Sequence, residues 1–132
     1  MEPLITLCSR EACLQIRQTT IDGTWSQCWL LQNNKDPRFL GADSLKIILS
    51  RLLDGLDNNS RQSEGKLGDY EAYWVLSLAE AHHALYIAKD GTERILLWQD
   101  ADRGISVVCE MRLSQNECSE WISKLRALIS AN

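Results

Sequence analysis

The chain has 132 residues, of which 45% are hydrophobic and 24% are charged. That length suits one folded domain, and that composition is typical of globular proteins rather than of disordered, fibrous or membrane-spanning chains. The net charge is -4 at pH 7, whereas most nucleic-acid-binding proteins carry a basic surplus gathered on one face. No apolar run approaches the roughly 20 residues of a membrane helix, and the first residues lack the basic region of a signal peptide. We therefore expect a cytoplasmic protein with no membrane contact.

The first half of the chain predicts four strands followed by a helix. The strands are expected at residues 4–8, 12–20, 25–32 and 38–40. Asp43 is a good N-cap for the helix, and Gly55 stands near its expected end. Apolar residues then recur at spacings of three and four, which places them on one helix face. These residues are Leu45, Ile48, Leu49, Leu52, Leu53 and Leu56. The following residues, 57–69, are almost wholly polar and predict a mobile connection.

The second half predicts the same order of elements. A strand is expected at residues 73–78, and Asp90-Gly91 lies between two apolar runs as the turn of an antiparallel hairpin. Residues 104–113 alternate between apolar and polar positions, which predicts a strand with one buried face. Ser114 and Glu117 form a capping box before the last helix. Its apolar stripe is Cys118, Trp121, Ile122, Leu125, Leu128 and Ile129.

The two halves also match locally. Asp22-Gly23-Thr24 corresponds to Asp90-Gly91-Thr92, and Glu11-Ala12 corresponds to Glu80-Ala81. The predicted fold is therefore α+β, with β-β-β-β-α repeats at residues 4–56 and 70–131 forming two packed antiparallel sheets with two amphipathic helices. A unit of about 65 residues seldom folds alone. Residues 1–132 are accordingly expected to form a single domain.

This order of elements resembles the Whirly-type fold of the single-stranded-DNA-binding transcriptional regulator superfamily, and it is similar to small uncharacterised cyanobacterial proteins of that fold. The resemblance covers the whole chain and implies two antiparallel sheets packed together with their helices. DNA-contacting members carry a Lys-Gly-Lys-Ala type signature in the first half, which this chain lacks. No DNA-binding residue is therefore carried over.

The cysteines and histidines predict neither a disulfide framework nor a metal site. The five cysteines are odd in number and show no C-x-x-C spacing, so reduced and buried thiols are expected. His82 and His83 are adjacent, and neighbouring side chains on a strand point to opposite faces. They could share a metal ion only from a turn. A partly exposed turn without a metal ion is the preferred interpretation. No metal is expected.

Catalytic and cofactor motifs are also missing from the sequence. Asp100 and Asp102 could bind a cation or act as general acid and base, but aspartate is common in turns for structural reasons. The glycines form neither a phosphate-binding loop nor a dinucleotide-binding fingerprint. The sequence therefore predicts a protein that is not an enzyme and has no cofactor.

The five tryptophans are many for this length and give the strongest functional signal. Trp25 and Trp29 share one face of a predicted strand, where Arg17 could accompany them. Trp98 and Arg94 lie on another predicted strand. We predict these five residues as a possible surface for a protein partner or for unpaired bases. Ordinary core packing is the alternative for each tryptophan.

Three functions remain open at this point. The first is a binding or assembly module that contacts a protein partner or a second copy of itself. The second is single-stranded nucleic-acid binding, which the acidic charge disfavours. The third is a small-ligand site between the two sheets. A continuous basic groove beside exposed aromatic side chains would favour the second over the first.

Overall fold

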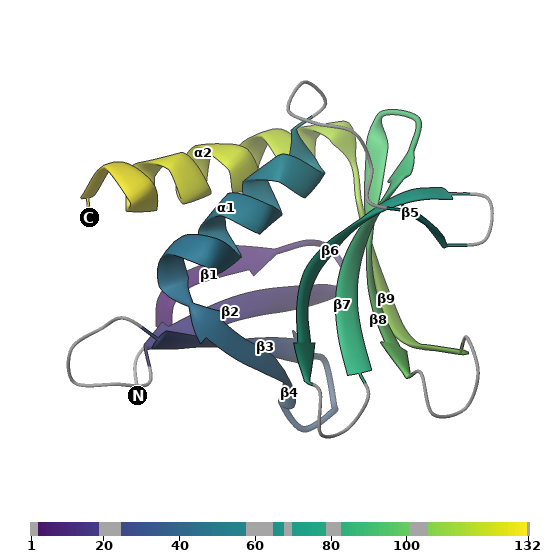
Figure 1. Cartoon of the computed structure of the whole chain (residues 1–132), viewed down its shortest axis with the longest axis horizontal. Coiled ribbons are helices and arrows are strands. Elements are labelled where there is room, and N and C mark those ends of the chain that lie inside the picture. Colours follow the sequence, from purple (N-terminus) through teal and green to yellow (C-terminus); the bar gives the residue numbers. More distant parts are fainter. Residues whose placement is uncertain are drawn as a thin grey trace.

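The computed structural model describes two antiparallel sheets and two helices (Figure 1). The residues that it describes are 3–18, 25–57, 65–67, 70–78, 83–100 and 106–131. Sheet A contains, in spatial order, β1 (Pro3–Cys8), β2 (Ala12–Gln18), β3 (Trp25–Gln32) and β4 (Arg38–Ser44). Sheet B contains, in spatial order, β5 (Gly65–Leu67), β6 (Tyr70–Leu78), β7 (His83–Asp90), β8 (Glu93–Asp100) and β9 (Ser106–Leu113). Helix α1 (Leu45–Leu56) follows sheet A, and helix α2 (Gln115–Ala131) follows sheet B.

The predicted α+β class with two four-strand-and-helix units is confirmed. One strand was not predicted: β5 lies within residues 57–69, which were expected to form only a polar connection. β5 pairs antiparallel with β6, so that Gly65 lies opposite Ala72. Three residues are too few for an alternating pattern to be recognised in a sequence. The predicted match at Asp22-Gly23-Thr24 falls outside the described residues.

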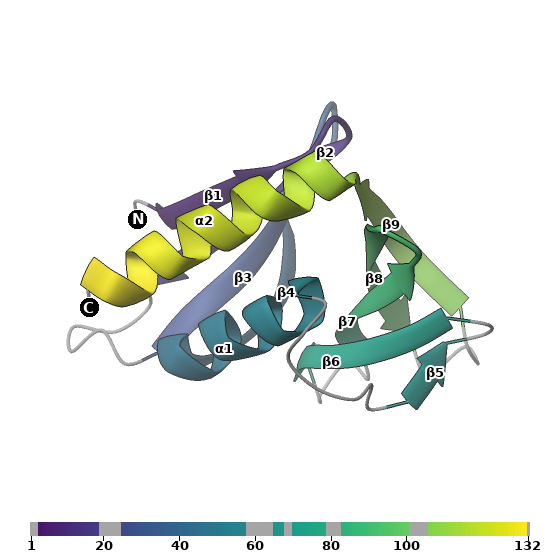
Figure 2. The ribbon, with the colours of Figure 1, turned by 90° about the horizontal axis from the view of Figure 1, so that it is seen from above.

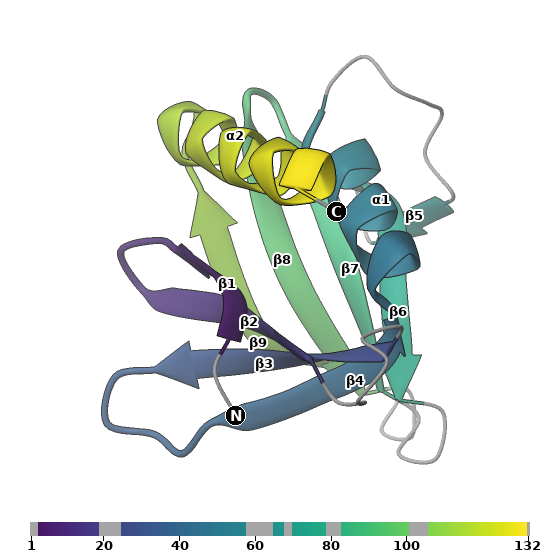
Figure 3. The same ribbon diagram turned by 90° about the vertical axis from the view of Figure 1, so that its left-hand side faces the viewer.

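The core lies between the two sheets, and both helices close its open side. Figures 2 and 3 show α1 and α2 on the same side of sheet A. Sheet B lies where α1 ends and α2 begins. Strand β3 shows the alternation that this arrangement needs, since Ser26, Cys28 and Leu30 are buried while Trp25 points away. The larger core cluster joins side chains of both sheets and both helices, among them Leu14, Ile16, Ile48, Leu52, Leu85, Ile87, Leu96 and Leu125.

Helix α1 ends at Leu56, as expected, but its N-cap and the role of Gly55 differ from the prediction. Ser44, not Asp43, is the N-cap, because its hydroxyl accepts a hydrogen bond from the Ile47 amide at 3.2 Å. Asp43 instead accepts from the Ser44 amide at 2.8 Å. Gly55 lies inside the helix, where an added Cβ atom would stand 2.8 Å from Cδ1 of Ile87. Glycine is therefore needed there for the close approach of α1 to β7 rather than to end the helix.

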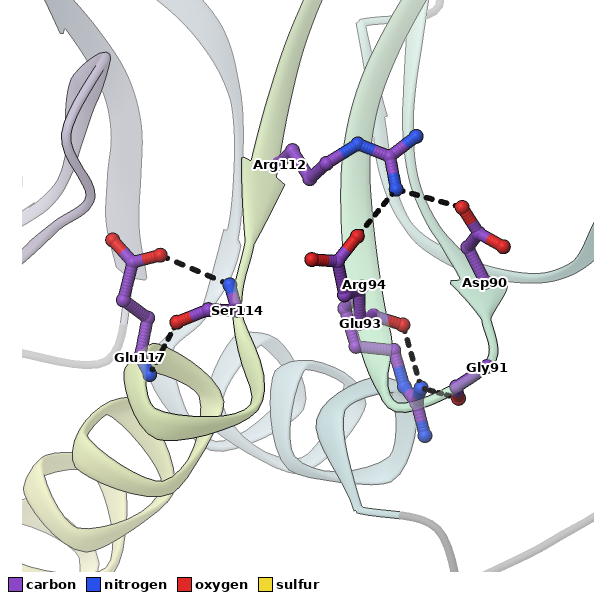
Figure 4. Close-up of polar contacts among 7 residues, drawn as sticks. All are labelled: Asp90, Gly91, Glu93, Arg94, Arg112, Ser114 and Glu117. Carbon is purple, nitrogen blue, oxygen red and sulfur yellow. Dashed lines mark hydrogen bonds and ion pairs between the residues drawn. The ribbon is translucent and has the colours of Figure 1, made fainter.

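Helix α2 has the predicted capping box. The Ser114 hydroxyl accepts from the Glu117 amide at 3.2 Å, and the Glu117 carboxylate accepts from the Ser114 amide at 2.9 Å (Figure 4). Cys118, Trp121 and Leu125 are its buried residues. The indole Nε1 of Trp121 donates to the Cys8 carbonyl at 2.9 Å. The last helix is thereby attached to the first strand.

The predicted Asp-Gly hairpin is confirmed between β7 and β8. Asp90 lies opposite Glu93, and Gly91 adopts a φ of 60° in the two-residue turn. None of the described helices is long and apolar enough to cross a lipid bilayer.

Candidate partner-binding surface

The face of sheet A that points away from the core, here called the outer face, has no helix over it (Figure 3). The strand registers bring its side chains together, since Gln15 lies opposite Trp29 and Arg17 lies opposite Gln27. Trp29 in turn lies opposite Phe39 on β4. Besides these residues, the outer face includes Thr6, Cys8, Cys13, Trp25 and Leu31.

The centre of the outer face is an ordered group of aromatic, amide and guanidinium side chains. The Arg17 guanidinium carbon lies 4.9 Å from the centroid of the Trp29 ring. The centroids of the Trp29 and Phe39 rings are 5.2 Å apart, and the two ring planes form an angle of 52°. Gln15 accepts from two nitrogens of Arg17 at 3.1 and 2.9 Å. Trp29 Nε1 donates to Gln27 at 3.0 Å. These contacts hold the group in one arrangement before any partner binds.

Trp25 is the exposed aromatic residue of this surface. Its side chain is 49% exposed, while Trp29 and Arg17 are half-buried. Among the described side chains of the outer face, Arg17 is the charged one and there is no carboxylate. A rigid aromatic face with one cation and several amides is well suited to dock against a protein surface, because aromatic and arginine side chains dominate the energetics of such interfaces.

Trp98 and Arg94 do not belong to this surface, so that part of the predicted site is wrong. Trp98 is 4% exposed and Arg94 is 1% exposed. Arg94 donates to the Gly55 carbonyl at the end of α1 at 3.2 Å. It also donates to the Gly91 and Glu93 carbonyls at 3.1 and 2.7 Å (Figure 4). Its role is to satisfy carbonyl oxygens where α1 meets the β7–β8 hairpin.

Trp98 and Arg94 lie on the side of β8 that faces the core, where Trp98 joins the larger core cluster with Leu96. The opposite side of β8 is covered as well. Every residue from Arg94 to Gln99 is buried, including Ile95 and Leu97, which point away from the larger core into a second cluster with Ala88. The apolar run at residues 95–98 is the sequence signal for such a strand. Phe39 was missed for another reason: its position beside Trp29 depends on the register of β3 and β4, which the five-residue connection at residues 33–37 does not specify.

The arginines that could have formed a basic track lie apart. Arg17 is on the outer face of sheet A over Trp29, whereas Arg38 shares the inner side with Leu30 and lies 5.2 Å from the Trp98 ring centroid. Arg94 is buried beside α1. The described residues therefore do not bring these three cations together along one groove.

The acidic turn between β7 and β8 is partly neutralised. Asp90 and Glu93 both accept from Arg112, at 2.7 and 2.8 Å (Figure 4). Two hydrogen bonds raise the pKa of Arg112 above its ordinary value: the bond to Asp90 has the larger effect, and the bond to Glu93 adds to it. Repulsion of phosphates by this turn is thus weaker than its two carboxylates alone would produce.

The expectation of reduced cysteines is wrong for one pair. Cys8 and Cys13 are joined by a disulfide, because they lie opposite each other in the register of β1 and β2. Cys28 and Cys118 are free and buried, as predicted. Burial raises the pKa of the Cys28 thiol to about 12, and burial also raises the pKa of Cys118. Both thiols are therefore protonated and unreactive at neutral pH.

The space between the sheets offers little room for a ligand. The cavity there has a volume of about 10 Å³ and is lined mainly by leucines, together with Trp98, Met111 and Glu110. That volume holds about one water molecule. Within the described ranges, no three side chains of His, Cys, Asp or Glu converge to hold a metal ion.

Comparison with known proteins adds no functional assignment. No protein-family model, curated protein or solved structure matches this chain. The resemblance to the Whirly-type fold stays a prediction from element order, and a shared fold would not by itself define a function.

Proposed function

We propose that the protein is a non-enzymatic cytoplasmic interaction module that binds a protein partner through the outer face of sheet A. The observation that carries the proposal is the exposed Trp25 on the same sheet face as the ordered Arg17–Trp29–Phe39 group, a face that neither helix covers (Figure 3). The partner can be another protein or a second copy of this chain.

A protein partner is favoured over a nucleic acid for a geometric reason. Unpaired bases bind by stacking on open aromatic faces along a cationic track. The Trp29 ring is already in contact with Arg17 and Phe39, and Arg17 is the single cation among the described outer-face side chains. Such a group can still bury apolar area against a complementary protein surface.

Single-stranded nucleic acid is the second candidate, because no carboxylate lies among the described side chains of the outer face. We expect this binding to be weak or undetectable at physiological salt, since phosphate neutralisation supplies most of the affinity of sequence-tolerant binders. A fluorescence-anisotropy titration with mixed DNA and RNA oligomers at several salt concentrations measures it. Submicromolar binding that Trp25→Ala abolishes would replace the protein-partner proposal.

The direct test compares two variants with similar exposure on different elements. Trp25 is 49% exposed on sheet A, and Ile129 is 43% exposed on α2. Tagged wild type, Trp25→Asp and Ile129→Asp are incubated with host lysate, and bound proteins and self-association are quantified by mass spectrometry and sedimentation velocity. The proposal expects Trp25→Asp to lose at least about tenfold of one specific association while Ile129→Asp retains it. Equal retention by both variants would refute the proposed surface.

A further inference from the structure

We propose that Cys8 and Cys13 form a reversible thiol–disulfide exchange site whose co-reactant is a dithiol. The site lies at the end of the β1–β2 hairpin, where the two cysteines are the last paired residues before the turn. Both cysteines lie on the outer face, but the proposal does not require a partner to bind there, because it concerns the chemistry of the sulfur atoms rather than the aromatic group.

Access distinguishes this pair from the other described cysteines. Cys8 is exposed and Cys13 is half-buried, whereas Cys28 and Cys118 are both buried. Exchange requires an incoming thiolate to reach one of the disulfide sulfurs, so solvent access decides which cysteines react. The Cys8 sulfur is the point of attack because its side chain is the more exposed of the two.

The hairpin is held closed by contacts other than the disulfide. The Ser9 amide donates to the Ala12 carbonyl at 2.8 Å. The Ser9 hydroxyl accepts from the Glu11 and Ala12 amides at 3.2 and 3.4 Å. These bonds contain no sulfur, so they persist after reduction and keep Cys8 opposite Cys13. Re-forming the disulfide is then an intramolecular step with a high effective concentration.

The proposed exchange has two steps. One thiolate of the dithiol attacks the Cys8 sulfur, the bond between the Cys8 and Cys13 sulfurs breaks, and Cys13 leaves as a thiolate that takes a proton from water. The second thiolate of the dithiol then attacks its own sulfur in the mixed disulfide, which releases the Cys8 thiolate. Two electrons pass from the dithiol to the protein, and the reverse sequence restores the disulfide.

From its position at the end of the β1–β2 hairpin, the disulfide site adjoins helix α2 and strand β3. The Cys8 carbonyl accepts the indole N–H of Trp121 on α2. Cys13 lies opposite Leu31 on the outer face of sheet A. In the cytoplasm, where we place the protein, disulfides are usually transient rather than permanent. A pair that opens and closes without unfolding fits that chemical setting.

The experiment uses the full-length folded protein in buffers with graded ratios of reduced to oxidised dithiothreitol. Free thiols are alkylated, the protein is digested with trypsin, and peptides are measured by mass spectrometry. Cleavage after Arg10 separates Cys8, in residues 1–10, from Cys13, in residues 11–17, so the disulfide is read as one linked pair of peptides. We expect the pair to disappear on reduction and return on oxidation, with an unchanged far-ultraviolet circular dichroism spectrum.

Two variants isolate the exchange step. Cys13→Ser removes the resolving thiol, so in buffer that contains oxidised glutathione the Cys8 thiolate should displace one glutathione thiolate and keep the other glutathione as a stable mixed disulfide, while the control Cys28→Ala should behave as wild type. In reduced folded protein, Cys8 should be alkylated at least about tenfold faster than Cys28. The proposal is overturned if the linked peptides never form in oxidising buffer. It is equally overturned if they resist reduction until the protein unfolds, or if Cys13→Ser traps no glutathione.

Discussion

Strands β3 and β8 occupy interior positions in their sheets, yet they are buried in different ways. β3 alternates, with Cys28 and Leu30 in the core and Trp29 on the outer face. β8 is buried on both faces from Arg94 to Gln99. A tryptophan on β3 can therefore reach a partner, whereas Trp98 on β8 cannot. The two strand-and-helix units share an order of elements but divide structural and surface roles between them.

Shortening one apolar side chain on each strand, on the side that points away from the larger core, tests this difference in burial. Ile95→Ala on β8 should lower the free energy of unfolding by about 2 to 4 kcal/mol, because Ile95 is only 2% exposed. Leu31→Ala on the half-buried outer side of β3 should cost less than about 1 kcal/mol. Urea unfolding measures both, and equal losses would show that the second face of β8 is not packed.

The arginines of the two units give a second contrast. Arg94→Ala should cost about 2 to 3 kcal/mol, because a buried guanidinium that bonds the Gly55, Gly91 and Glu93 carbonyls is removed. Arg17→Ala should cost less than about 1 kcal/mol, because Arg17 lies on a half-exposed face. Thermal and urea unfolding of both variants test this. Similar costs would contradict the assigned roles.

Because Cys28 is buried on the inward face of β3, we expect the free energy of unfolding to depend on pH in the alkaline range. Cys28 has an ordinary pKa of 9.0 and a pKa of about 12 in the folded state. Between these values the unfolded chain loses the thiol proton while the native state keeps it. Stability should therefore fall as pH rises above 9, by about 1.4 kcal/mol per pH unit from this thiol.

Cys28→Ala should have a flatter alkaline slope than wild type, whatever its stability at pH 7. Urea unfolding at pH 8, 9 and 10 measures the slopes. Identical slopes in the two proteins would show that the Cys28 thiol titrates normally in the folded state, and hence that the inward face of β3 admits water.

The smallest expected effects compare the two helix caps. Ser114→Ala removes one hydrogen bond of a reciprocal capping box and should cost about 1 kcal/mol. Ser44→Ala removes a single cap bond to the Ile47 amide and should cost about 0.5 kcal/mol. Thermal unfolding with Ser→Gly variants as controls resolves the two, and a larger cost at Ser44 would reverse the ranking.

Much of the fold follows from local signals in the sequence. The alternation in β3, the Asp90-Gly91 turn and the Ser114 capping box each depend on a few neighbouring residues, so they could be predicted. The short strand β5 could not, because its pairing with β6 is a tertiary effect. For Trp98 the signal was present: four apolar residues in a row at 95–98 indicate a strand buried on both faces.

The candidate surface was predictable only in part, for the same reason. Period-two alternation places Trp25 and Trp29 on one face of β3. Which neighbours they acquire depends on strand register, which placed Phe39 beside Trp29. Arg94 is absent because β8 belongs to the other sheet, where the Arg94 side chain is buried against α1. Register also placed Cys8 opposite Cys13. Because the predicted strands at residues 4–8 and 12–20 already faced each other across a short turn, that pairing could have been foreseen.

The hydrogen bond from Trp121 to the Cys8 carbonyl has a consequence for synthesis of the protein on the ribosome. Strand β1 is synthesised well before α2, which covers its inner side. During translation the apolar inner face of sheet A thus stays uncovered until α2 has been synthesised. Native contacts between residues so distant in sequence also slow folding, because the intervening chain must be ordered first. The domain should therefore acquire its native state only after α2 has left the ribosome, and until then the growing chain exposes apolar surface that chaperones bind.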